Sequence, residues 1–137
     1  MKIAILGATS HIAKDLVASI AKQTTYQCDL FMRAPARLDP EIRAIAEQRS
    51  FALLDYASFD DSRHFDAIIN FVGVGDPARA IQMGKDIFTV TEQYDNLALS
   101  YLQRHPECRY IYLSSGAAYG ANFESPVTET SKAVFAV

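Results

Sequence analysis

The sequence has few cysteines and no long hydrophobic run, and both features narrow its class. Among its 137 residues, Cys28 and Cys108 are the only cysteines. They lie far apart within apolar runs, so we expect buried, reduced thiols in a cytoplasmic protein. No Cys/His spacing is typical of a zinc site, and the sequence therefore predicts no metal. No run reaches the roughly 18 apolar residues of a membrane-spanning helix, and the first residues do not predict a signal peptide.

A strong charge of either sign is also missing. The formal net charge is -3, half of the residues are hydrophobic and 21% are charged, which is an ordinary globular mixture. This balance gives no broad electrostatic reason to expect nucleic acid or an anionic membrane as a partner. A small anionic ligand can still bind where backbone geometry outweighs a weak overall charge. The length is sufficient for one domain, residues 1–137, with its own core.

Short apolar runs alternate with amphipathic stretches along the chain. The apolar runs predict buried strands, and the stretches with a 3.6-residue period predict helices. The predicted strands are Lys2–Leu6, Cys28–Met32, Phe51–Leu54, Asp66–Val72 and Arg109–Leu113. The predicted helices are His11–Lys22, Pro40–Gln48, a short Phe59–His64, a turn that opens at Asp76-Pro77, and Lys85–Arg104.

This alternation is typical of a parallel sheet covered by helices on both faces. Right-handed crossovers then predict an α/β fold with a doubly wound sheet of five strands in the order 3-2-1-4-5. In such sheets, ligands bind beyond the carboxyl ends of the strands, near the switch between strands 1 and 4. The residues that follow each strand are therefore the candidates for a functional site.

The turn after the first strand has small residues that suit a phosphate group. Gly7 allows a tight turn because it has no Cβ, and the following helix offers unpaired N–H groups and a positive dipole end. Thr9 and Ser10 add hydroxyl donors, and His11 and Ile12 begin the helix. These five residues are candidate cofactor ligands. An ordinary strand–turn–helix connection with a solvent-facing His11 is the alternative.

The second strand is followed by Arg33 and Arg37. An acidic residue at this place usually reads the ribose of NAD, whereas an arginine accommodates the 2′-phosphate of NADP. A guanidinium group binds phosphate with two parallel hydrogen bonds. The pair therefore favours NADP over NAD, and two surface arginines on a loop are the alternative. A methyltransferase on a similar sheet is disfavoured, because that class of enzyme requires an acidic residue at the position of Arg33.

The other strand ends carry further polar residues. Asp55 follows the third strand, where it either accepts a hydrogen bond from an adenine amino group or caps the next turn. Asn70 lies on the fourth strand, and Gly73 after it lets the backbone pass beneath a ribose. Ser114 and Ser115 follow the fifth strand, where their hydroxyl groups are suitable donors to a substrate oxygen.

Four segments, taken in order, resemble one known family. Tyr112–Gly120 resembles the Ser-Ser-x-x-x-Tyr-Gly signature of extended short-chain dehydrogenases/reductases, the NAD(P)-dependent epimerase/dehydratase family. Gly7–Ala13 resembles its glycine-rich turn, Asn70–Gly73 its Asn-Ala-Ala-Gly segment, and Pro126–Glu129 the polar stretch that follows. The resemblance implies a Rossmann domain that binds a dinucleotide cofactor. It also implies a small-molecule substrate, a nucleotide-sugar or a similar carbonyl or hydroxyl compound.

The resemblance also assigns roles around the reaction. Ser115 matches the catalytic serine of the family, whereas Tyr119 does not match its catalytic tyrosine, which belongs to a Tyr-x-x-x-Lys pair. No tyrosine in this sequence has a lysine four residues later, so we expect that pair beyond Val137. The chain is then a truncated part of a longer enzyme, inactive alone and without the substrate domain. A non-catalytic NADP-sensing or protein-interaction module is the alternative.

The long predicted helix has two possible uses. Members of the resembled family often pair through helices of this region, so Lys85–Arg104 is a candidate surface for a homodimer. Packing of this helix on its own sheet requires no partner, and we take it as the default expectation.

Overall fold

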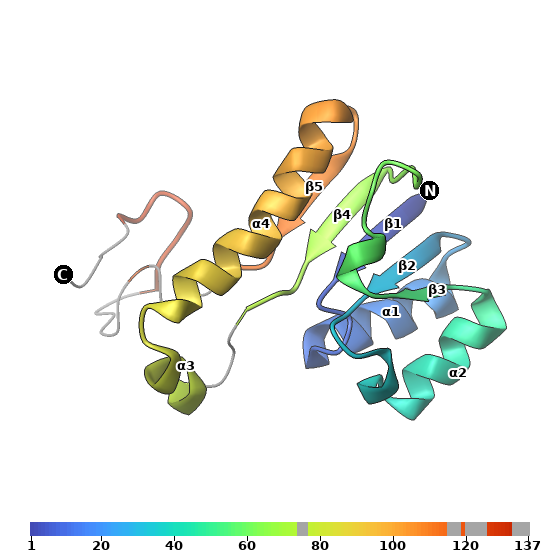
Figure 1. Ribbon diagram of the computed structural model, residues 1–137, viewed down its shortest axis with the longest axis horizontal. Helices are drawn as coiled ribbons and strands as arrows, with labels where there is room; N and C mark the ends of the chain where they lie inside the picture. Colours follow the sequence, from blue (N-terminus) through green and yellow to red (C-terminus); the bar gives the residue numbers. More distant parts are fainter. Residues whose placement is uncertain (74–76, 115–118, 120–125, 133–137) are drawn as a thin grey trace.

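The computed structural model describes residues 1–73, 77–114, 119 and 126–132. Its sheet is parallel throughout and has the strand order β3-β2-β1-β4-β5, which confirms the predicted topology (Figure 1). The strands are β1 (Lys2–Leu6), β2 (Gln27–Phe31), β3 (Ala52–Leu54), β4 (Ala67–Asn70) and β5 (Arg109–Tyr112).

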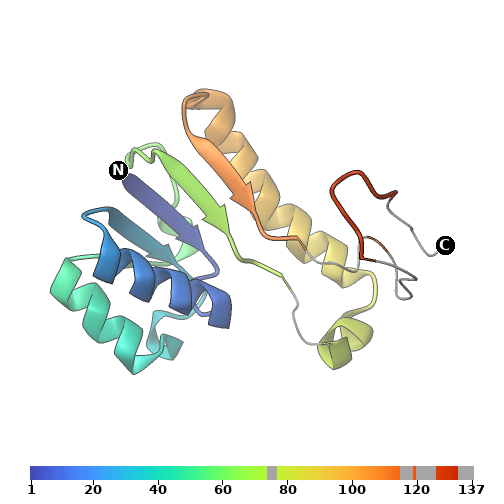
Figure 2. The same cartoon turned by 180° about the vertical axis from the view of Figure 1, so that it is seen from behind.

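Helices cover both faces of the sheet. The α-helices are α1 (His11–Gln23), α2 (Pro40–Arg49), α3 (Pro77–Met83) and α4 (Asp86–Arg104), and the 3-10 helices are η1 (Pro35–Arg37) and η2 (Tyr56–Ser58). Figures 1 and 2 show α1 and α2 on one face and α4 on the other. Among the described residues, no helix is long and apolar enough to cross a bilayer.

The first helices begin where the sequence supplies a cap. The Ser10 hydroxyl accepts a hydrogen bond from the Ala13 N–H at 3.1 Å at the start of α1. The Asp39 carboxylate accepts one from the Glu41 N–H at 3.0 Å, and Pro40 occupies the first position of α2. Both caps satisfy N–H groups that have no partner inside a helix, so they fix the first residue of each helix.

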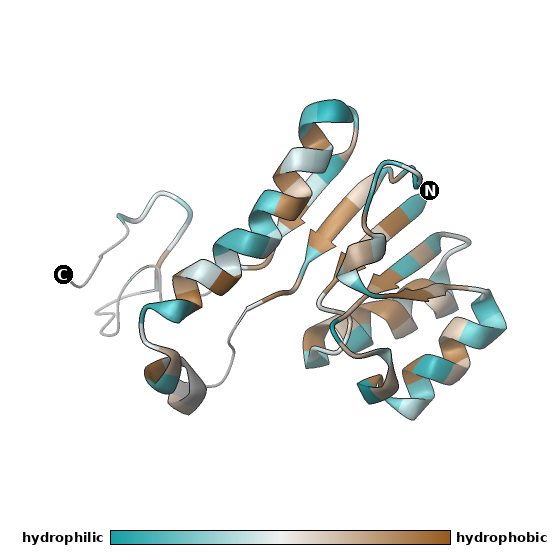
Figure 3. Ribbon diagram, viewed as in Figure 1, coloured by the Kyte–Doolittle hydropathy of each residue, from teal (hydrophilic) through white to brown (hydrophobic). Residues whose placement is uncertain are grey.

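Strand β1 sends alternate side chains to opposite faces of the sheet. Ile3 and Ile5 join the core formed with α1 and α2, whereas Ala4 and Leu6 join the core beneath α4. A period of two residues is a property of the pleated strand. Because both faces are covered, β1 is apolar from Ile3 to Leu6, and Figure 3 shows hydrophobic colouring along most of β1 and β4.

The core beneath α4 is largely aromatic. Phe59 packs against Phe31 and Tyr101 with ring centroids 5.0 and 5.6 Å apart. The Tyr101 hydroxyl accepts a hydrogen bond from the Phe65 N–H at 2.9 Å and donates one to the Arg63 carbonyl at 3.0 Å. The helix is therefore attached both to its own sheet and to the loop before β4. This confirms the default expectation for this helix, and the homodimer stays a prediction.

The predicted helix at Phe59–His64 was wrong. The structure has η2 before this segment, followed by turns. The Asp60 carboxylate accepts a hydrogen bond from the Ser62 N–H at 2.9 Å, and Phe59 and Phe65 are buried in the aromatic core. Short aspartate side chains that bind nearby backbone N–H groups favour turns over helix, and this local competition prevents a helix here.

The two cysteines are free and buried, as predicted. Burial raises the pKa of the Cys28 thiol to about 12, so this group stays protonated near neutral pH. It contributes to the fold as a small apolar side chain.

Replacing Tyr101 by Phe will test the attachment of α4. The change removes the hydroxyl group and leaves the Phe65 N–H buried without its acceptor, so we expect the free energy of unfolding to fall by about 1–3 kcal/mol. Urea denaturation followed by circular dichroism measures this loss. The matched control is Tyr26→Phe, since Tyr26 is 37% exposed and should change little. Equal effects in the two variants would contradict the assignment.

Candidate functional site

A cavity of about 550 Å³ opens at the carboxyl ends of β1, β2 and β4. The volume lies within the range of about 300–1,000 Å³ that is typical of small-molecule sites. Its walls come from the turn after β1, the segment after β2 with η1, η2, the segment after β4, the end of α3, and the first half of α4. This is the topological switch point of the sheet, because β2 and β4 lie on opposite sides of β1.

The turn at Gly7 crosses closely over the backbone that follows β4. Gly7 has φ +79°, and a Cβ at this position would lie 3.0 Å from the Phe71 carbonyl carbon and from the Val72 nitrogen. The Gly7 N–H donates to the Phe31 carbonyl at 3.1 Å and to the Tyr56 hydroxyl at 2.9 Å. Both the backbone angle and the lack of space require glycine here. The turn therefore brings the start of α1 to the cavity.

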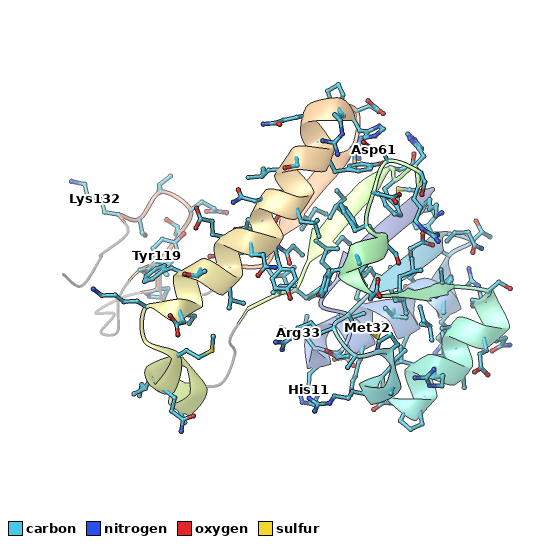
Figure 4. The ribbon with its side chains drawn as sticks, viewed as in Figure 1. His11, Met32, Arg33, Asp61, Tyr119 and Lys132 are labelled. Carbon is cyan, nitrogen blue, oxygen red and sulfur yellow. The ribbon has the colours of Figure 1, made fainter. Side chains whose placement is uncertain are left out.

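Ser10 and Thr9 both line the cavity at the start of α1. The Ser10 hydroxyl accepts the capping hydrogen bond of this helix, so its own proton remains to be donated. His11 and Ile12 are exposed and do not appear among the described lining residues. Figure 4 shows His11 on the outside of the molecule at the start of α1. Their binding of a cofactor stays a prediction.

Two arginines give the cavity a positive charge. Arg33 follows β2, and Arg37 ends η1; both side chains are exposed and line the cavity. Figure 4 labels Arg33. Pro35 begins η1 and fixes the backbone between them. None of the described lining residues is acidic. The cavity is thus locally basic in a protein of net charge -3, and this combination suits a phosphate-bearing ligand.

Two tyrosines in the cavity wall were missed at the level of sequence. Tyr56 on η2 and Tyr94 on α4 pack with ring centroids 4.5 Å apart. Burial raises the pKa of Tyr56 to about 12, so it stays protonated near neutral pH and keeps a proton to donate. Tyr94 belongs to the apolar stripe of its helix, but this pattern does not indicate which strand end the residue faces.

Asn70 ends β4, directly before the lining residues Phe71 and Val72, and its side chain forms hydrogen bonds within the protein. Its Nδ2 donates to the Asp95 carboxylate and to the Tyr110 hydroxyl, both at 3.0 Å. Its Oδ1 accepts from the Val72 N–H at 2.8 Å. The Tyr110 hydroxyl donates to the same carboxylate at 2.8 Å. This network joins β4, α4 and β5, so the contacts give Asn70 a positioning role, and its binding of a cofactor stays a prediction.

Asp55 has the capping role that was one of its two predicted uses. Its Oδ1 accepts hydrogen bonds from the Ser58 N–H at 3.1 Å and from the Ser58 hydroxyl at 2.9 Å. It does not appear among the described lining residues of the cavity. An adenine contact through the other carboxylate oxygen stays a prediction.

A family comparison identifies the relatives of this chain. Residues 3–135 match the sequence model of the NAD dependent epimerase/dehydratase family. The chain belongs to this family. No curated protein sequence matches it.

Solved structures of this epimerase/dehydratase fold resemble the chain closely in shape. UDP-glucose-4-epimerase from Stenotrophomonas maltophila, with bound NAD and formylated UDP-arabinopyranose, gives a TM-score of 0.77 at 15% identity over 98% of this chain and 43% of that one. The UDP-Glc/GlcNAc 4-epimerase of Campylobacter jejuni gives 0.75 at 18% identity, over 97% and 43%. A dTDP-glucose 4,6-dehydratase from Bacillus anthracis, in complex with NAD, gives 0.75 at 14%, over 98% and 44%. The chain therefore spans less than half the length of these structures.

The serine pair of the family signature follows β5. Ser114 is exposed and lies at the same edge of the sheet as Gly7, because β1 and β5 run in the same direction with β4 between them. Ser115, the predicted catalytic serine, lies outside the described residues, and its role stays a prediction. Gly73 lines the cavity, and a Cβ added at this position would have no atom within 4 Å.

Replacing Gly7 by Ala will test the close crossing at the site. The substitution places a Cβ against backbone atoms that cannot move independently, in addition to the strain of a positive φ. Gly84→Ala is the matched control, because Gly84 also has a positive φ, +51°, but no atom within 4 Å of its Cβ position. We expect Gly7→Ala to lose about 1–3 kcal/mol more unfolding free energy than Gly84→Ala in chemical denaturation. Equal losses would show that the crossing is not tight.

Proposed function

We propose that this chain binds a dinucleotide cofactor in the cavity, as the nucleotide-binding part of an epimerase, dehydratase or reductase. The substrate class is a nucleotide-sugar or a similar carbonyl or hydroxyl compound. The observation that carries the proposal is the meeting of three features in one cavity at the switch point: the Gly7 turn, the start of α1 and two arginines.

Each feature suits one part of the cofactor. The turn brings the unpaired N–H groups at the start of α1 toward a pyrophosphate, and Thr9 and Ser10 add hydroxyl donors. Gly73 leaves room for a ribose beside the backbone after β4. A nicotinamide cofactor held by these residues would supply hydride transfer to or from the substrate. Ser115 is proposed as a hydrogen-bond donor to the substrate oxygen, beyond the end of β5.

Arg33 and Arg37 support NADP as the preferred cofactor. Two of the relatives named above, the Stenotrophomonas maltophila epimerase and the Bacillus anthracis dehydratase, were solved with NAD, so the preference for NADP rests on this chain's own residues. A guanidinium group pairs with a phosphate dianion through parallel charge-assisted hydrogen bonds, and NAD has no phosphate at the ribose 2′ position. No acidic side chain among the described lining residues is present to read that ribose instead.

A second candidate is a non-catalytic module that senses NADP or binds another protein. Both candidates require the same cofactor site. They differ in turnover by a longer gene product that includes this chain: the enzyme interconverts a nucleotide-sugar, and the module binds the cofactor without reaction.

Titrating the chain with NADPH and with NADH, followed by nicotinamide fluorescence, tests the proposal. We expect tighter binding of NADPH, and Arg33→Ala should weaken NADPH by about tenfold or more while changing NADH little. Arg109→Ala is the matched control, because Arg109 begins β5 at the opposite edge of the sheet. Tighter binding of NADH would refute the NADP preference. Absence of binding of both cofactors at about 1 mM would refute the cofactor site itself.

A further inference from the structure

A second polar cluster lies at the amino ends of β4 and β5, at the opposite edge of the sheet from the cavity. His64 lies in the loop before β4, and His105 and Glu107 lie between α4 and β5. The Arg109 N–H donates to the Asp66 carbonyl at 3.0 Å, which holds the two loops side by side. One nitrogen or oxygen atom from each of the two histidines and from the glutamate lies within 4.8 Å of the others.

We propose that His64, His105 and Glu107 bind a divalent transition metal ion of the Zn²⁺ type. Two imidazole nitrogens and one carboxylate oxygen form a ligand set that zinc accepts, with a fourth position open to water. Tetrahedral donors at about 2.1 Å from the metal lie about 3.4 Å apart, so the three atoms must move inward by roughly 1 Å. The side chains of His64 and Glu107 are 62% and 60% exposed and can make this movement by rotation.

His105 is already oriented for this role. Its Nδ1 lies 3.8 Å from the Glu107 Oε1, and its Nε2 lies 3.3 Å from the Asp61 Oδ1. Its ring stacks on the Tyr101 ring with centroids 4.2 Å apart. A histidine that donates one ring N–H to a carboxylate presents the other nitrogen to a metal, and such carboxylates orient the ligand. Asp61 is therefore a positioning residue.

Asp61 is itself held in place by its neighbour. The Arg104 Nε donates to the Asp61 Oδ2 at 2.7 Å. This contact leaves the other carboxylate oxygen, Oδ1, 3.3 Å from the His105 Nε2. On the other side of the cluster, the His64 Nε2 lies 3.9 Å from the Asp66 Oδ1, so a second carboxylate faces the other imidazole.

A simpler account of the cluster is an ionic network. In it, protonated imidazoles pair with the carboxylates of Asp61, Asp66 and Glu107, and no metal binds. The two accounts differ in what a metal ion does to the protein. Binding at the proposed site joins the loops before β4 and β5, so it stabilises the folded chain by an amount that rises with the logarithm of metal concentration above the dissociation constant. An ionic network gives no stoichiometric response to the metal.

The test uses the tag-free chain and two metals near neutral pH. We expect Co²⁺ to bind with one equivalent and produce visible d–d absorption, Zn²⁺ to displace it, and Zn²⁺ to raise the melting temperature. His64→Ala and Glu107→Gln should each weaken Zn²⁺ by at least about tenfold, because both exposed side chains can be removed without disturbing the core. Asp61→Asn should weaken binding less, with an unchanged circular dichroism spectrum.

Two controls limit the interpretation. His11→Ala removes the third histidine, which lies at the opposite edge of the sheet, and should leave metal binding unchanged. Cys108→Ser removes the buried thiol next to Glu107 and should also leave it unchanged. The proposal is overturned if Co²⁺ does not bind at about 1 mM, if His64→Ala and Glu107→Gln bind as the unmodified chain does, or if either control abolishes binding.

Discussion

The close crossing of the Gly7 turn over the backbone after β4 is the constraint on which the rest of the site depends. Without a Cβ, Gly7 lets β1 end against Phe71 and Val72 while its N–H binds both the Phe31 carbonyl and the Tyr56 hydroxyl. The end of β2, the helix η2 that follows β3, and the segment after β4 thus all contact this one residue. The position of α1, and with it the direction of its unpaired N–H groups, follows from this contact.

The parallel sheet places two different groups of polar residues at the two ends of its strands. The carboxyl ends carry the basic cavity with Arg33 and Arg37, and the amino ends carry the cluster of His64, His105 and Glu107. All strands run in the same direction. The loops that precede the strands therefore lie together at one end of the sheet, and the loops that follow the strands lie together at the other end. A single domain can therefore hold an anion site and a proposed cation site without interference between them.

Between the two ends of the strands, buried and partly buried polar groups join α4 to the sheet. Asn70, Asp95 and Tyr110 share hydrogen bonds of 2.8 to 3.0 Å, and Tyr101 binds two backbone groups of the loop before β4. No described buried side-chain polar atom lacks a partner. Such satisfied networks hold a helix at one position along a sheet, which apolar packing alone specifies less sharply. Tyr94 directly precedes Asp95 on α4, so this network also holds Tyr94 at the cavity.

The sequence alone determined the order of elements, because period, caps and strand-ending turns are local. Ser10 and Asp39 marked their helices, and the alternation gave the strand order; the local competition of aspartate turns explains the missed segment at 59–64. Only the tertiary structure decided that Tyr56 enters the cavity wall and that His64 meets Glu107. These meetings depend on the register of strands far apart along the chain, which no local pattern records.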